Sequence, residues 1–293
     1  MEIAFIGIGR MGRPMVERLA AAGHNVRIQN RTRAKAEELA GPNVTVAATA
    51  SEAAQQAEVV LTCLPTPVEV ERVYEELAGV ARQGQVYADH STVGLELNRS
   101  CAARLAAKGA GFLDAPVSGG PAGAQGGSLT VMVGGEQAHY DAAVPAFEAY
   151  GKNIRLCGPV GAGQAVKLVN QLLVGIHTAA ISEAAVFGTK LGADPQVLLE
   201  MIGTSFGGST MMTRNLPRFM SRDFAPATPI DLILKDLGLI HDEAKDAGTP
   251  LLLGALAEQR FGEASARHLG DQDMSALVQL SEEPSGITLA KGD

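Results

Sequence analysis

Three glycines near the start of the chain constrain its fold more than any other feature. Residues 5–14 read FIGIGRMGRP and place Gly7, Gly9 and Gly12 in G-x-G-x-x-G spacing. The run follows a β-rich segment, residues 2–6, and opens a helix-like stretch, Met11–Ala22. A strand that turns on glycines into a helix is the first half of a βαβ unit. The loop therefore predicts a Rossmann-type, doubly wound parallel sheet.

Strand-like and helix-like segments then alternate to about residue 160, as expected for such a sheet. Further β-rich runs are residues 25–29, 58–63, 85–89, 111–116, 128–135 and 153–158, and helix-like stretches are Arg33–Ala40, Pro67–Ala78 and Leu95–Ala107.

Strand signals stop after residue 160, and the remaining pattern is helical. Gly163–Leu191 could form one helix about 40 Å long at 1.5 Å per residue. Later helical segments are Pro195–Ile202, Thr210–Phe219, Pro229–Ala247, Pro250–His268 and Met274–Glu282. We predict an α/β chain with a Rossmann-type domain at residues 1–160. An all-helical substrate and oligomerisation domain follows at 161–293, with the long helix between the domains.

The glycine loop also predicts a dinucleotide site. Its glycines would allow a tight turn, close approach of the backbone to a pyrophosphate, and close packing of helix on strand, with the pyrophosphate at the helix N-terminus. We therefore assign Gly7, Gly9, Arg10, Met11 and Gly12 to cofactor binding. A tight turn without a ligand is the alternative, and the strand–loop–helix context disfavours it.

The end of the second predicted strand indicates which dinucleotide. A carboxylate there would bind the ribose 2′-hydroxyl of NAD, but the sequence reads Asn30, Arg31, Thr32. The amide removes a charge that would repel a 2′-phosphate, and the planar guanidinium can grip one. The cluster predicts NADP(H). A solvated loop with Thr32 as a helix N-cap is the alternative, and both can hold at once.

Two more glycine-rich segments carry candidate chemistry. In DAPVSGGPAGAQGG, residues 114–127, the N–H groups of Ser118, Gly119 and Gly120 could bind a substrate carboxylate, or the segment could be a flexible hairpin connection. In GPVGAGQAVKLVNQ, residues 158–171, Lys167 and Asn170 share a helix face with Gln171. A desolvated lysine there could act as a general acid/base. A surface lysine is the alternative.

Composition excludes several classes of protein. A net charge of −8 argues against nucleic acid and anionic membrane surfaces as partners. Cys63, Cys101 and Cys157 lack metal-ligand spacing, so no metal is expected, and their odd number suggests a reducing compartment. No leader precedes the first strand, and the long apolar stretch carries too many polar residues to span lipid comfortably. We expect a cytoplasmic protein.

Four motifs in order resemble the β-hydroxyacid dehydrogenase family, which includes 3-hydroxyisobutyrate dehydrogenase, tartronate semialdehyde reductase and glyoxylate/succinic semialdehyde reductases. They are GIGRMG, DAPVSGG, GAGQAVKLVNQ and IDLILKDLGLI, and the resemblance runs collinearly to about residue 283. It implies that Lys167 is the general acid/base and Asn170 orients the substrate, whose carboxylate Ser118, Gly119 and Gly120 would bind. It also implies that Leu64, Pro65 and Thr92 line the nicotinamide side, with Glu69 and Lys235 at the cofactor site. Lys235 could instead pair with Asp231.

The expected activity is reversible hydride transfer between NADPH and a small aldehyde or keto acid bearing a carboxylate, in a cleft between the domains. An imine reductase, a 6-phosphogluconate dehydrogenase and a non-catalytic NADP-binding protein are the alternatives. The lysine at 167 disfavours the first, the short C-terminal part disfavours the second, and the intact substrate motifs disfavour the third. The sequence does not name the substrate, and its helical part favours a homodimer or homotetramer.

Overall fold

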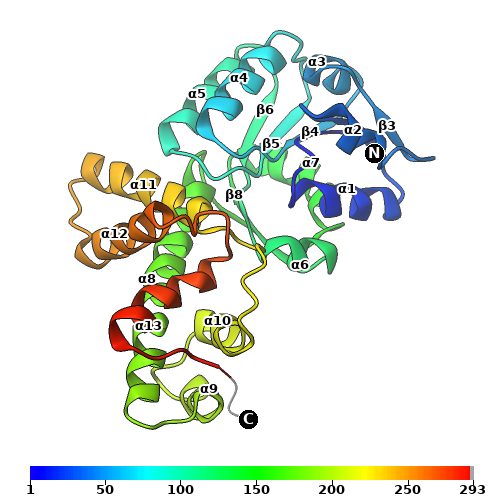
Figure 1. Cartoon of the computed structure of the whole chain (residues 1–293). Coiled ribbons are helices and arrows are strands. Elements are labelled where there is room, and N and C mark those ends of the chain that lie inside the picture. Colours follow the sequence, from blue (N-terminus) through cyan, green and yellow to red (C-terminus); the bar gives the residue numbers. More distant parts are fainter. Residues whose placement is uncertain (291–293) are drawn as a thin grey trace. The chain divides into compact units, whose positions relative to one another are not determined.

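The computed structural model describes residues 1–290 and divides into two compact units. The first unit is Met1–Leu168 and the second begins at Val169. The predicted fold class is confirmed, because a mixed α/β unit is followed by a helical one (Figure 1).

The first unit is built on a sheet with the strand order of a dinucleotide-binding fold. Within residues 1–290 nine strands form one sheet, in the order β3-β2-β1-β4-β5-β6-β8-β7 with β9 beside β8. Strands β1 to β6 are mutually parallel along this order, and β8 is antiparallel to β6 and β7. The strands are β1 (Glu2–Ile6), β2 (Asn25–Gln29), β3 (Val44–Val46), β4 (Val59–Thr62), β5 (Val86–Asp89), β6 (Gly111–Asp114), β7 (Val117–Ser118), β8 (Leu129–Gly134) and β9 (Gly151–Gly158).

Helices cover both faces of this sheet, and the alternation along β1 shows why. Ile3 and Phe5 enter one core with α1 (Gly12–Ala21), α2 (Arg33–Glu37), α6 (Gly120–Gln125) and α7 (Gln137–Phe147). Ala4 and Ile6 enter the other with α3 (Ala50–Ala54), α4 (Pro67–Ala78) and α5 (Leu95–Ala106). A central parallel strand is thus apolar on both sides, which explains the continuous apolar run in EIAFI.

Within residues 169–290 the second unit consists of helices and the segments that connect them. Its helices are the later part of α8 (Ala162–Lys190), then α9 (Pro195–Gly203), α10 (Thr210–Ser221), α11 (Ile230–Asp246), α12 (Leu252–Ala266), a 3₁₀ turn (Met274–Val278) and α13 (Gln279–Ser285). Ile181 and Val186 of α8 pack against Phe219 of α10 in its core.

A buried carboxylate, Asp273, fixes the loops of this unit. It pairs with Arg214 at 2.8 Å and accepts N–H bonds from Thr228 and Ser275. Burial opposes its ionisation, but the hydrogen bonds from Arg214 and Thr228 outweigh burial and lower the pKa of the carboxyl well below its usual range.

Helix α8 is long and apolar enough to cross a membrane by length and composition alone. A third of its most apolar window is buried within the chain, and core helices of soluble proteins pass the same test. The helix is therefore weak support for a membrane span. The absence of a membrane partner stays a prediction.

Several short elements were not predicted from the sequence. They are β3, α3, α6, α7 and the two-residue β7. Residues 114–127, for which a flexible connection was the alternative, instead form β7 and α6. Such short elements depend on packing rather than on propensity, since isolated helices of this length are marginal in water.

Candidate active site

The phosphate loop has the geometry that its three glycines predict. Gly7 has φ +103°, and a Cβ there would lie 2.2 Å from the carbonyl oxygen of Cys63, so only glycine fits. A Cβ on Gly12 would lie 2.0 Å from the Gly7 carbonyl oxygen, because helix and strand pack closely. A Cβ on Gly9 would meet nothing within 4 Å. The protein's own packing therefore explains two of the glycines, and open space beside the third fits the approach of a pyrophosphate to the N-terminus of α1.

The turn after β2 is held to this loop by Asn30. Its Oδ1 accepts a hydrogen bond from the Ile8 N–H at 3.0 Å, and its Nδ2 donates to the Thr32 carbonyl at 2.9 Å. Thr32 occupies the N-cap position of α2, but its side chain makes no capping hydrogen bond. The capping alternative thus holds by position only, and the Thr32 hydroxyl is not used to cap the helix.

Arg31 projects from the same turn into solvent and is exposed over 80% of its side chain. Its Nη1 lies 2.6 Å from an oxygen of Glu69, in the first turn of α4, where the Thr66 hydroxyl accepts from the Glu69 N–H and donates to the Glu69 carboxylate. Two predicted cofactor residues, Arg31 and Glu69, are therefore brought together. Arg33 instead pairs with Glu37 along α2.

A buried polar network supports the loops after β4 and β5, where Leu64, Pro65 and Thr92 were predicted to face the nicotinamide. Ser91 accepts a hydrogen bond from the Leu64 N–H at 2.9 Å and donates to Asp89 at 2.6 Å. Thr62 also donates to Asp89, at 2.7 Å. Asp89 and Ser91 were not predicted from the sequence. The available signal was a polar residue closing the buried strand QVYAD.

The candidate substrate loop leaves the sheet at β7. Ser118 ends that strand, and Gly119 and Gly120 follow with φ of +130° and +64° at the start of α6. Positive φ at both residues is a conformation that glycine adopts readily and other residues rarely, which accounts for the two glycines after Ser118. Ser118 and Gly120 are half-buried and Gly119 is exposed.

The beginning of α8 is anchored to the end of β6 by Asp114. Its two carboxylate oxygens accept hydrogen bonds from the N–H groups of Gly161 and Gln164, each at 2.7 Å. Burial raises the pKa of this carboxyl to about 6, although both N–H bonds oppose the rise. The Gln164 side chain donates to the Ser91 carbonyl at 2.5 Å. Asp114 stands at the start of the DAPVSGG motif, but no role was predicted for it from the sequence.

Lys167 follows one turn later and is only 7% exposed, so the surface-lysine alternative is wrong. Lysine is seldom buried to this degree without a partner or a functional reason. Gln171, on the same helix face, is buried as well, and Asn170 is half-buried.

Within the second unit, Asn170 begins a polar chain that reaches Lys235. The Asn170 amide donates to Gln171 at 3.0 Å, and Gln171 donates to Asp236 at 2.5 Å. Asp236 in turn forms an ion pair with Lys235 at 2.9 Å. Lys235 thus pairs with its neighbour Asp236.

The unit 1 residues predicted for the cofactor and substrate gather at one edge of the sheet. They follow β1, β2, β4, β5 and β7 or open α1 and α4, and strands β1 to β6 run parallel, so the loops after β1, β2, β4 and β5 emerge together. β1 lies between β2 and β4, the crossover point where such sheets bind nucleotides.

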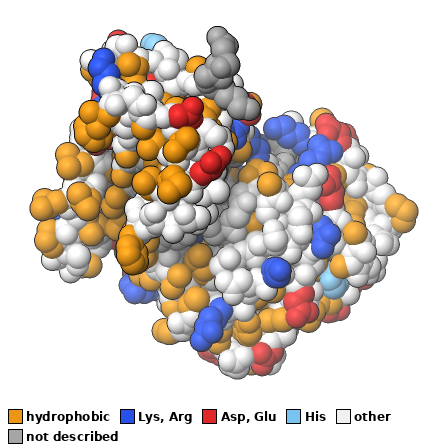
Figure 2. Space-filling view, turned by 90° about the horizontal axis from the view of Figure 1, so that it is seen from below, with side chains coloured by type: hydrophobic (Ala, Val, Ile, Leu, Met, Phe, Trp, Pro, Cys, Tyr) orange, Lys and Arg blue, Asp and Glu red, His pale blue; other side chains and the backbone are white. Residues whose placement is uncertain are grey.

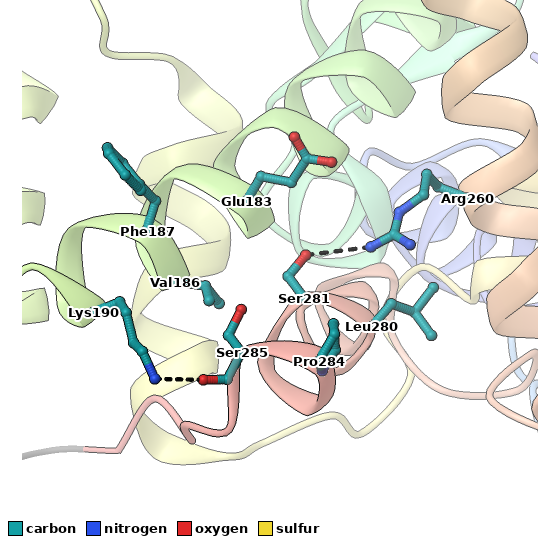
Figure 3. A pocket seen from close by; sticks show the side chains of 9 residues that line it. All are labelled: Glu183, Val186, Phe187, Lys190, Arg260, Leu280, Ser281, Pro284 and Ser285. Atoms are coloured by element: carbon teal, nitrogen blue, oxygen red, sulfur yellow. Dashed lines mark hydrogen bonds between the residues drawn. The ribbon is translucent and has the colours of Figure 1, made fainter.

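A cavity of about 400 Å³ lies elsewhere, in the second unit (Figure 3). It is lined by residues of α8, α12 and α13, and Lys190 at its edge donates to the Ser285 carbonyl at 2.7 Å. None of the predicted site residues lines it.

Two further features bear on metal binding and on thiol chemistry. No group of three or more His, Cys, Asp or Glu side chains in residues 1–290 could hold a metal ion. Cys63 borders the phosphate loop, but burial, with the charge of Asp89, raises the pKa of its thiol to about 12, so it stays protonated.

Known family models match both parts of the chain. A model described as the NAD binding domain of 6-phosphogluconate dehydrogenase matches residues 2–158, and one described as NAD-binding of NADP-dependent 3-hydroxyisobutyrate dehydrogenase matches residues 161–281. The fold and the phosphate loop thus define an oxidoreductase that binds a nicotinamide dinucleotide.

Relatives match over nearly the whole chain. The 2-(hydroxymethyl)glutarate dehydrogenase of Eubacterium barkeri is 36% identical, over 100% of this chain and 98% of its own length. The 2-hydroxy-3-oxopropionate reductase of Escherichia coli is 34% identical, over 96% and 97%. The chain belongs to the β-hydroxyacid dehydrogenase family, the NAD(P)-dependent hydroxyacid dehydrogenases.

Solved structures agree with this assignment. The 3-hydroxyisobutyrate dehydrogenase of Mycobacterium tuberculosis, described with L-serine, is 35% identical with a TM-score of 0.88, covering 95% of this chain and 98% of that one. Psf3, in complex with NADP+ and 2-OPP, is 25% identical with a TM-score of 0.87, covering 95% and 99%. An imine reductase from Pseudomonas sp., 19% identical with a TM-score of 0.65 over 94% and 98%, shares the fold alone.

Proposed function

We propose that this chain is an NADPH-dependent reductase of small aldehyde or keto acids, acting reversibly, with Lys167 as the general acid/base. The observation that carries the proposal is a buried lysine on the first turns of α8, at the position of the family's catalytic motif. A buried ammonium is expensive to desolvate, and buried titratable groups gather at functional sites, which supports a catalytic role for this lysine.

The proposed chemistry divides between the cofactor and the chain. The nicotinamide supplies the hydride when the cofactor is bound. The N–H groups of residues 118–120 would bind the substrate carboxylate, and Asn170 would orient the carbonyl. Lys167 would donate its proton to the oxygen that gains negative charge and would accept it again in the reverse direction.

NADP(H) is the proposed cofactor because the turn after β2 carries no carboxylate. Asn30 is engaged with the phosphate loop, whereas Arg31 extends into solvent beside Glu69 and can exchange that carboxylate for a 2′-phosphate. The bound NADP+ described for Psf3 is consistent with this choice.

The proposed substrates are semialdehydes and keto acids of two to five carbons, glyoxylate included. By their names, the Escherichia coli relative acts on a three-carbon oxo acid and the Eubacterium barkeri relative on a six-carbon hydroxy diacid, so both substrates carry a carboxylate but differ in length. A methylene changes selectivity by only about 1–3 kcal/mol, so the chain length preferred must be measured.

A homodimer or homotetramer is also proposed. Large apolar side chains stay exposed on the helical unit, and hydrophobic surface is prominent in Figure 2. They include Leu173 and Phe187 on α8 and Leu252, Leu253 and Leu256 on α12. Soluble monomers seldom expose many such side chains together. Analytical ultracentrifugation at several concentrations tests this expectation.

The decisive test is NADPH oxidation, followed by absorbance, against a panel of semialdehydes and keto acids of two to five carbons, with cyclic imines as the contrasting set. Turnover of the acids alone supports the proposal. Turnover of imines alone would indicate an imine reductase, and NADPH binding without turnover of either set would indicate a binding protein.

A further inference from the structure

The first turn of α8 is clamped to the sheet at three points, all within the first unit. Asp114 accepts its two N–H bonds there, from Gly161 and Gln164. The Gln164 side chain reaches the Ser91 carbonyl. Gly163 is the third point: a Cβ there would lie 2.3 Å from the Met132 carbonyl oxygen, so the helix rests directly on the backbone of β8.

Close contact is required on the sheet side as well. A Cβ on Gly134, at the end of β8, would lie 2.4 Å from a carboxylate oxygen of Asp114 and 2.8 Å from the Gly163 nitrogen. Gly134 and Gly163 therefore allow the Asp114 carboxylate and the backbone of α8 to come into direct contact. An ordinary helix cap does not need such contact, because an exposed serine or threonine suffices.

The clamp adjoins two of the loops that the proposed reaction uses. Asp114 lies four residues before Ser118 and opens the same segment, and Ser91 precedes Thr92. Gln164 lies three residues before Lys167, hence on the same side of the helix. Any shift of the first turn is passed to Lys167, because the backbone of a helix is stiff over one turn.

We infer that Asp114, with Gln164, is a positioning residue that sets where Lys167 meets the substrate carbonyl. The inference rests on the proposed function. Asp114 touches no reacting atom in this scheme; it holds the helix that carries the acid. A displacement of about 1 Å at a catalytic group can cost about 100-fold in rate, so a small loosening of the clamp is enough to matter.

A double-mutant cycle tests this. Asp114→Asn keeps the size of the side chain but can accept only one of the two N–H bonds. We expect kcat to fall about 10- to 100-fold, with the NADPH dissociation constant unchanged within about twofold. In a Lys167→Ala background the same substitution should change kcat less than about threefold, because a residue that acts through Lys167 has nothing left to position.

A merely structural role gives a different pattern. Asp114→Asn would then lower kcat by the same factor in the wild-type and in the Lys167→Ala background. That result would overturn the inference and leave the role of Lys167 intact. An unchanged kcat in Asp114→Asn would overturn it too. If Lys167→Ala itself kept full kcat, the acid role in the proposed function would fail first and the inference with it.

Two further variants keep the test decisive. Thr49→Ala is the matched control, since Thr49 caps α3 in the same unit through the Glu52 N–H at 3.0 Å. It should lower thermal stability and leave kcat unchanged. Gln164→Met preserves volume and removes the bond to Ser91. If Asp114→Asn does not fold, Gln164→Met replaces it in the double-mutant cycle with Lys167→Ala. Equal fold-losses of kcat in the two backgrounds would then contradict the inference in the same way.

Discussion

A lysine buried at the start of a long helix is the residue on which the proposed chemistry depends. Lys167→Ala should lower kcat about 10²- to 10⁴-fold, the contribution of a well-placed general acid, which is about 3–5 kcal/mol of transition-state stabilisation. The dissociation constant for NADPH, measured by fluorescence titration, should stay nearly unchanged. Lys167→Arg should rescue little, because a guanidinium does not release its proton.

Lys190, near the other end of α8, supplies the control. It is exposed and donates to the Ser285 carbonyl, far along α8 from Lys167, so its replacement by alanine should leave kcat unaltered. If Lys167→Ala kept more than about a tenth of kcat with chemistry rate-limiting, the proton would have to come from water or another side chain.

Arg31 is the residue that should discriminate between the two dinucleotides. Arg31→Ala should weaken NADPH far more than NADH, since only NADPH has a 2′-phosphate to lose, and a charge-assisted contact is worth about 1.5–3 kcal/mol. Values of kcat/KM with both cofactors check this. Arg33→Ala is the matched control, because Arg33 pairs with Glu37 on α2. Equal losses with both cofactors in Arg31→Ala would contradict the assignment.

In the strand–loop–helix of residues 2–21, packing requires glycine at positions 7 and 12. Gly9 faces open space, and we expect it to be needed for cofactor binding instead. Gly9→Ala meets open space, so the melting temperature should hardly change, while the NADPH dissociation constant should rise about 10- to 100-fold through lost backbone contact. Gly12→Ala collides with the Gly7 carbonyl and should cost about 1–3 kcal/mol of stability or more. Thermal melts and titrations of both variants test the pair. A stability loss in Gly9→Ala would mean that this glycine is also structural.

Elements with a strong local pattern could be predicted from the sequence, and those held by packing could not. The helix Pro67–Ala78 was predicted with its observed bounds, because Pro67 and Thr66 mark its start. Helix α6 could not be predicted, since Gly120, Gly123 and Gly126 within or beside it disfavour a helix locally. It forms where Ala124 is buried against the sheet.

The candidate site shows the same division. Spacing alone predicted the glycines of the phosphate loop, whereas Lys167 was selected through the resemblance of its segment to a family motif. Spacing could not reveal that Asp114 bonds to Gly161 and Gln164, because those contacts join residues 47 and 50 positions apart. Nor could it show the pairing of Arg31 with Glu69, which joins the turn after β2 to the first turn of α4, 38 residues away. Contacts of that separation exist only once the sheet has formed.

Two buried groups of the first unit, His90 and Asp114, make the stability of the protein depend on pH in opposite directions. The His90 ring lies with Nδ1 2.6 Å from the Ala115 carbonyl and Nε2 2.9 Å from the Tyr150 hydroxyl. Nδ1 must therefore carry the proton, and Nε2 accepts from Tyr150. Burial lowers the pKa of His90 to about 4, although the bond to Ala115 opposes the shift.

The direction of each effect follows from which state binds the proton more tightly. For His90 the unfolded chain binds the proton more tightly. The stabilisation that neutral His90 provides is therefore fully present above a pH of about 6.5 and is lost as the pH falls towards 4. The loss is on the order of 3 kcal/mol at 1.36 kcal/mol per unit. For Asp114, whose pKa is raised to about 6, the folded protein binds the proton more tightly. Its contribution therefore grows as pH falls from 6 towards 4, and it masks part of the His90 effect in the wild-type protein.

Comparison with His90→Gln isolates the histidine, because Asp114 and every other titrating group are present in both proteins. The variant should be less stable at pH 7, where it lacks the paired ring, and the stability difference between the proteins should shrink by up to about 3 kcal/mol between pH 6.5 and 4. Urea unfolding of both proteins across this range, followed by circular dichroism, measures the difference. A difference independent of pH would show that His90 is protonated as readily in the folded unit as in the unfolded chain, which its burial between Phe5, Phe147 and Tyr150 argues against.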